Sequence, residues 1–204
     1  MDISVDGHVQ PLNPLPRTIG VLLDELRTSA AREHRVILSV RVDGADVDIN
    51  AQRRIATEPT SRFSAVAVET ADAKSLCVAT LDEASRHIQP VIDEAARLSD
   101  LLDAGRESEA LARISPCLEI LGTIIAAVEK VSILLELDLH EVAHDGSTLA
   151  EVVGRLTDFL RDLKKSIEDR DLVAVRDSMK HELPGVADSL AQQLTALSSV
   201  VAAS

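Results

Sequence analysis

The sequence predicts an α+β protein, with a small mixed α/β module over residues 1–71 followed by an acidic helical bundle over residues 72–204. Three observations predict this class. Before residue 71, short segments alternate apolar and polar residues and meet at Asp-Gly pairs, which favour hairpin turns. After it, apolar residues recur at the spacing of amphipathic helices. The chain also has 2 Phe and no Tyr or Trp in a composition that is 46% hydrophobic, so its core must be aliphatic.

The N-terminal module is predicted to contain two hairpins, a helix between them and a last strand. Asp6-Gly7 and Asp43-Gly44 supply the positive-φ residues that two-residue hairpin loops need. Thr18 has the side chain of a helix N-cap, and the apolar residues after it follow helical spacing. The expected elements are strands at 2–5, 8–10, 36–42, 45–49 and 63–68, a helix from 19 to about 33, and a loop with one helical turn at 50–61.

The order of hairpin, helix, hairpin and final strand is that of the β-grasp fold. The residues ISVDGHVQ and TIGVLLDEL resemble the opening of the ubiquitin-like sulfur-carrier proteins, which implies a β-grasp-like module. Sulfur carriers act through a free Gly-Gly tail, whereas here Glu69-Thr70-Ala71 continues into a helix. Ferredoxins of this fold need four cysteines, and residues 1–71 contain none. We therefore expect the module to be an interaction surface or a dimerisation element.

The second part is predicted to form four helices in two helix–turn–helix units. Asp72 can cap the first helix and Gly105 can end it. Thr148 and Glu151 have the spacing of a capping box at the start of the third helix. The expected helices run from 72 to about 104 with Pro90 inside, from 107 to 139 with Pro116 inside, from 149 to about 167, and from 169 or 171 onward with Pro184 inside. Short turns make neighbours antiparallel, so the prediction is an antiparallel four-helix bundle.

One segment of the second part resembles a known family. The residues FLRDLKKSIEDRDLVAVRDSMKHELPGV are similar to helical hairpins of bacterial flagellar export chaperones. The resemblance implies that this part of the chain binds a protein partner.

The net charge, the apolar stretches and the cysteines indicate which partners and which location to expect. The net charge is −13, and most of it falls in residues 72–204, so the chain should repel nucleic acid and anionic membranes. The longest apolar stretch, 120–128, is too short to span a bilayer. Cys77 and Cys117 stand alone in apolar helical patterns and are expected to be buried thiols. With no signal peptide at the N-terminus, we expect a cytoplasmic protein of bacterial type.

One motif offers a specific chemistry. His140-Glu141-Val142-Ala143-His144 has the HExxH spacing with which a helix presents two imidazoles to zinc and a carboxylate to its water. Acidic neighbours flank the motif and Gly146 follows at once, which instead favours exposed residues at a fraying helix end. We therefore assign no catalytic, cofactor-binding or metal-binding residue. The alternative keeps zinc as cofactor, with His140 and His144 as ligands and Glu141 as the base.

The sequence thus predicts a non-enzymatic protein that self-associates and acts as an adaptor or chaperone-like partner. The segment ILGTIIAAVEKVSILLELDL, residues 120–139, is apolar nearly all round, so it must be central in the bundle or buried in an oligomer interface. Two alternatives stay open. One is a zinc-dependent hydrolase that uses the HEVAH motif, and the other is a small-molecule sensor with a pocket in the bundle.

Overall fold

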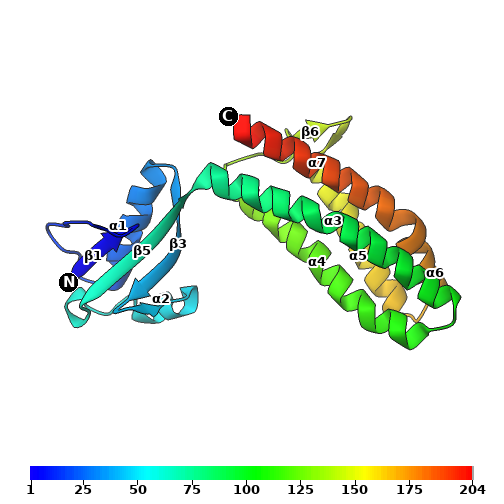
Figure 1. Ribbon diagram of the computed structural model, residues 1–204, viewed down its shortest axis with the longest axis horizontal. Coiled ribbons are helices and arrows are strands. Elements are labelled where there is room, and N and C mark those ends of the chain that lie inside the picture. The colour runs from blue at the N-terminus through cyan, green and yellow to red at the C-terminus, as the bar shows by residue number, and fades with distance from the viewer. Residues whose placement is uncertain (204) are drawn as a thin grey trace. The chain divides into compact units, whose positions relative to one another are not determined.

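The computed structural model describes residues 1–203, and the chain is a mixed α+β protein with a small N-terminal sheet and several helices (Figure 1). It divides into two compact units, one of residues 1–76 and one that begins at Cys77. Each unit has its own cluster of buried apolar side chains. Strand β5 ends at Asp72 and helix α3 begins at Ala73, where the sequence pattern changes from alternation to helical spacing.

The N-terminal unit is a five-stranded sheet with one long and one short helix. Its elements are β1 (Asp2–Val5), β2 (His8–Val9), α1 (Ile19–Arg32), β3 (Arg35–Val42), β4 (Ala45–Asp46), α2 (Ile49–Ile55), a 3₁₀ turn η1 (Thr60–Arg62) and β5 (Ala65–Asp72). The strand order is β2-β1-β5-β3-β4, with β1 parallel to β5 and the other neighbours antiparallel. The buried face of α1 packs with the strands in one aliphatic cluster made of Ile3, Ile19, Leu22, Leu23, Leu26, Val40, Val42, Val66 and Val68.

Both predicted hairpin turns of this unit are confirmed. Asp6 and Gly7 have φ of 50° and 78°, and Asp43 and Gly44 have φ of 51° and 84°. Positive φ at both central residues is what a two-residue turn needs to match the twist of its strands. The predicted N-cap is also confirmed, since the Thr18 hydroxyl accepts a hydrogen bond from the backbone N–H two residues into α1.

One prediction for this unit is wrong. The strand expected over 45–49 ends at Asp46, and Ile49 instead begins a seven-residue helix, α2. The carboxylate of Asp48 causes the change, because it accepts a hydrogen bond from the Ala51 N–H at 2.7 Å and caps the helix. Helix α2 reaches α1 at Gly20, where an added Cβ would lie 2.8 Å from a backbone oxygen of Ala56. Only glycine permits that approach.

The second unit consists of long helices around one aliphatic core, and these helices lie side by side (Figure 1). Its elements are α3 (Ala73–Asp103), which begins in the first unit and continues into the second, α4 (Glu107–Leu134), β6 (Ala143–His144), β7 (Ser147–Thr148), α5 (Leu149–Glu168), α6 (Leu172–Asp177), a π-helical turn η2 (Ser178–Glu182) and α7 (Leu183–Ala203). The predicted stops and starts hold at several helix ends. Asp72 accepts from the Ser75 N–H at 2.8 Å, Gly105 has φ of 72°, and Thr148 and Glu151 form a capping box.

The π-helical turn lies where the sequence places a proline inside a helix. Pro184 has no N–H and its ring would clash with the carbonyl four residues earlier. Widening the preceding turn to the π form relieves that clash and lets α6 continue into α7 without a loop. Within residues 1–203, no helix combines the length and the apolar character that crossing a membrane requires.

Candidate functional site

The HEVAH motif does not lie on a helix. The second helix was predicted to extend to residue 139, just before the motif, and this prediction is wrong. Helix α4 ends at Leu134, and Glu136 takes a positive φ of 53°, which stops the helical path. His140 and Glu141 lie in a turn, and His144 lies in strand β6. The i, i+4 presentation of two imidazoles from one helix face is therefore lost.

A hairpin replaces the expected helix end. Asp145 and Gly146 have φ of 50° and 78°, the same turn conformation as the other two Asp-Gly pairs. Ala143 pairs with Thr148 and His144 with Ser147 across this turn. The sequence signal was present, but strands of two residues carry no alternation by which they could be recognised.

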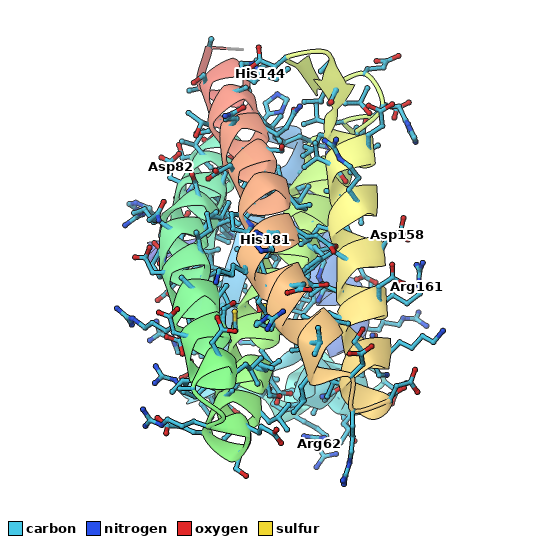
Figure 2. All side chains as sticks on the ribbon, turned by 90° about the vertical axis from the view of Figure 1, so that its right-hand side faces the viewer. Arg62, Asp82, His144, Asp158, Arg161 and His181 are labelled. Atoms are coloured by element: carbon cyan, nitrogen blue, oxygen red, sulfur yellow. The ribbon has the colours of Figure 1, made fainter. Side chains whose placement is uncertain are left out.

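The buried side chain of Gln193 fixes this hairpin to α7. Gln193 is 2% exposed, and its Nε2 donates to the backbone oxygens of His144 at 3.0 Å and Ser147 at 2.8 Å. Its Oε1 is buried and has no partner among the described residues. Figure 2 shows the hairpin with His144 beside the end of α7. The segment thus has a structural explanation that does not involve a metal.

A zinc site needs a third ligand beside two imidazoles, and two carboxylates that follow the motif in the sequence, Glu151 and Glu168, are engaged in other contacts. The Glu151 carboxylate accepts from the Thr148 N–H at 2.9 Å in the capping box. Glu168 lies at the far end of α5, where it pairs with Lys164 at 3.9 Å. Among residues 1–203, no three or more His, Cys, Asp or Glu side chains come together in a way that could hold a metal ion.

One concave surface of the second unit is a groove between α3 and α4, with a volume of about 560 Å³. We call it the α3–α4 groove. Ala84 and Ile124, both buried, form its floor, while Ile120 on its wall stays 37% exposed. It is lined by Thr80, Glu83, Ala84, His87, Pro116, Glu119, Ile120, Thr123, Ile124 and Ala127. Half of the ten lining residues are apolar, and the other half are polar or charged residues from both helices.

The groove continues along α4 over a flat strip of small side chains. A second hollow shares part of the lining and adds Gly122, Ala126 and Lys130. Helix α4 buries the opposite face, which carries Ile114, Cys117, Leu121, Ile124, Val128 and Val131. The sequence had indicated a helix that is apolar all round. The structure shows that one apolar face meets the core and the other, made of small residues, faces outward.

The charges on the groove are mainly acidic. Glu83 pairs with His87 at 3.0 Å and with Arg86 at 2.9 Å along α3. A fork of two hydrogen bonds, from Arg113 Nε and Nη2 to Glu94, ties α4 to α3 at 2.7 and 3.0 Å. The Arg113–Glu94 contact joins the two helices, whereas the Glu83 contacts lie within α3.

Cys117 lies on the buried face of α4 and is not a reactive thiol. Burial, and to a lesser extent the nearby Glu94 carboxylate, raises the pKa of Cys117 to about 11. Thiolate is the nucleophilic form, so this cysteine is almost entirely protonated at neutral pH. Cys77 is also buried.

The N-terminal unit has one polar cluster with a small cavity of about 140 Å³ beside it. Asp6 accepts from the Thr70 N–H and hydroxyl, both at 2.7 Å, and from Arg35 at 3.1 Å. The hydrogen bonds from Thr70, followed by Arg35, lower the pKa of Asp6. Each oxygen of Asp6 is thus engaged by the fold, and the cluster ties the first hairpin turn to β5 and β3.

No family model, no curated protein and no solved structure matches this chain.

Proposed function

We propose that the chain is a non-enzymatic interaction protein of adaptor or chaperone-like type, which binds a protein partner through the α3–α4 groove and self-associates. The observation that carries the proposal is the groove itself. It is a long apolar depression between two helices, bordered by acidic side chains, on a surface that the chain leaves uncovered in its own unit. Apolar depressions of this kind accept the apolar face of a partner helix.

The architecture that we propose for this function is a β-grasp-like module followed by an antiparallel four-helix bundle. A sheet in the order β2-β1-β5-β3-β4, with β1 and β5 parallel and one helix packed on it, is consistent with a β-grasp. Helices α3, α4, α5 and α7 around one core are consistent with the bundle. Both cysteines are buried in the second unit. We propose a cytoplasmic location, where thiols are kept reduced.

A small-molecule sensor is the second candidate, and the same groove favours it. Its volume of about 560 Å³ falls in the range of small-molecule sites, roughly 300–1,000 Å³. The lining also combines apolar residues with polar groups such as Thr80 and His87, as such sites do. The groove is an open channel on the unit's surface, however, and an elongated partner fills such a shape better than a compact ligand.

Photo-crosslinking in the native host separates these candidates. A photoreactive p-benzoylphenylalanine would replace Thr123 in the full chain, and a control chain would carry it at Arg161. Both positions are exposed, and Arg161 projects from α5 into solvent (Figure 2). Polypeptide adducts from position 123 but not from 161 support the proposal. No adduct from position 123, or the same adducts from both, would overturn it, and an adduct of small-molecule mass would favour the sensor.

A further inference from the structure

We propose that the partner at this surface is a second copy of the chain, packed α4 against α4 in antiparallel orientation about a two-fold axis. This inference rests on the proposed function, because it names the partner of the same surface. Three independent observations on the outer face of α4 carry it: two unpaired opposite charges, a helical glycine that the chain's own packing does not need, and an exposed isoleucine.

The charges are Glu119 and Lys130. Both are exposed, and among the described residues neither makes an ion pair. Lys130 follows Glu119 by eleven residues, which is close to three full helical turns. The two side chains therefore lie on one face of α4, about 16 Å apart along the helix axis. They are the two ends of the strip of small residues in the second hollow.

The two charges are self-complementary in one arrangement only. A two-fold axis that crosses α4 between residues 124 and 125 places Glu119 of one copy opposite Lys130 of the other, and does so twice. The same axis places Gly122 opposite Ala127, so small residues face small residues at the centre. A parallel pairing would instead set Glu119 against Glu119 and Lys130 against Lys130, which is repulsive.

Gly122 is the second observation. It lies inside α4, where glycine is less favourable than alanine because it loses more backbone freedom on folding. A Cβ built on Gly122 would meet no atom within 4 Å, so the chain's own packing does not require a glycine here. Close approach of another helix backbone does require one, and small residues at the contact are what permits it.

Ile133 is the third observation. It is 77% exposed, which is the largest exposed fraction among the large apolar side chains of residues 1–203. It lies on the same outward stripe of α4, fourteen residues after Glu119. The proposed axis sets it opposite Pro116 of the second copy, at the mouth of the α3–α4 groove, and so buries it against an apolar wall.

Paired charge reversals test the inference in the full chain. Sedimentation equilibrium would measure the dimer dissociation constant of wild type, Glu119→Lys, Lys130→Glu and the double reversal. Each single variant sets like charges opposite each other twice, and the expected result is about a tenfold weaker dimer. The double reversal restores the wild-type constant. An equimolar mixture of the two single variants forms a heterodimer, because their charges are then complementary.

A matched control uses the exposed ion pair between Asp158 and Arg161 on α5, which point into solvent in Figure 2. Exchanging these two charges keeps the net charge and should leave the dimer unchanged. Crosslinking provides a readout independent of charge. In an equimolar mixture of Thr123→Cys chains and Ala126→Cys chains, mild oxidation should give a covalent dimer of one chain of each kind, because the axis sets these positions opposite each other. Cys117 should not compete, since it is buried.

The outcomes separate this inference from the proposed function. The inference is overturned if the wild-type chain stays monomeric up to about 100 µM, near the top of the concentration range of such an experiment. It is also overturned if the dimer is insensitive to both single reversals. If position 123 still crosslinks to another polypeptide in the host, the partner-binding part of the proposed function stands, and self-association fails together with this inference. If it does not, both fail.

Discussion

Because the HEVAH segment forms a hairpin held by Gln193, removing the Gln193 side chain should lower the stability of the protein by a predictable amount. The change is Gln193→Leu, which keeps a side chain of similar size in the buried site but removes both donors to the hairpin. The matched control is Gln192→Leu, one residue earlier on the exposed face of α7. If the hairpin is fixed to α7 as described, only the first change should affect stability.

The expected loss follows from the two hydrogen bonds. Each contributes about 1 kcal/mol net, and a buried carbonyl left without a donor costs more than that. Removing the unpartnered Oε1 offsets part of the loss. The predicted decrease in the free energy of unfolding is therefore about 1–3 kcal/mol for Gln193→Leu, and less than about 0.5 kcal/mol for Gln192→Leu.

Urea unfolding followed by circular dichroism measures both variants. Hydrogen exchange adds a local readout, because the amides of residues 138–148 should exchange faster in Gln193→Leu and not in the control. Equal stability of the two variants, with unchanged exchange over 138–148, would refute the placement of the hairpin against α7.

Three other predictions follow from the described contacts. Asp6→Asn should lower stability only at pH values where Asp6 is ionised. The hydrogen bonds from Thr70 lower the pKa of Asp6 below the ordinary 3.8. The wild-type advantage in stability is therefore complete above pH 3.8 and is lost as pH falls through the lower folded pKa, which unfolding curves across pH can check. Cys117, with a pKa of about 11, should resist iodoacetamide at pH 8 in the folded protein and react once the protein is unfolded. Peptide mass spectrometry can measure the extent of labelling. Fast labelling of the folded chain would contradict the burial of this thiol. His144→Ala should leave zinc content and any zinc-induced shift of the thermal midpoint unchanged, because His140 and His144 do not share a helix face; loss of one bound zinc per chain would restore the metal alternative.

Much of the local structure could be predicted because it depends on neighbouring residues. The Asp-Gly pairs at 6–7 and 43–44 fix their turns through positive φ. Thr148 and Glu151 satisfy each other's backbone amides within one helical turn. These signals need no information about tertiary packing, so the sequence alone identifies them.

The errors arise where local signals are short or compete. Residues 135–139 continue an apolar pattern that favours helix, but Glu136 adopts a positive φ and the chain turns away. The third Asp-Gly pair, at 145–146, gives a hairpin with the same geometry as the other two, yet its strands are too short to show a period. Gln193 lies far along the chain, and its bonds to the hairpin are long-range contacts that spacing cannot reveal.

The candidate site was predicted only in outline. The segment 120–139 was expected to be central or buried in an oligomer interface, and self-association remains a proposal. The groove depends on how α4 faces α3, which the composition of α4 alone does not determine. The small residues from Gly122 to Ala127 were the available signal, because in a helix they define a surface with room for a neighbour.

The most direct test of the central proposal compares two glycines. Gly122 lies on the outer face of α4 and Gly154 on α5, and an added Cβ meets no atom within 4 Å at either position. Sedimentation equilibrium of the full chain should give twice the chain mass for wild type and Gly154→Leu, and the single-chain mass for Gly122→Leu, while all three keep the same helical circular dichroism. A monomeric wild type, or a Gly122→Leu variant that dimerises as tightly as Gly154→Leu, would contradict the account.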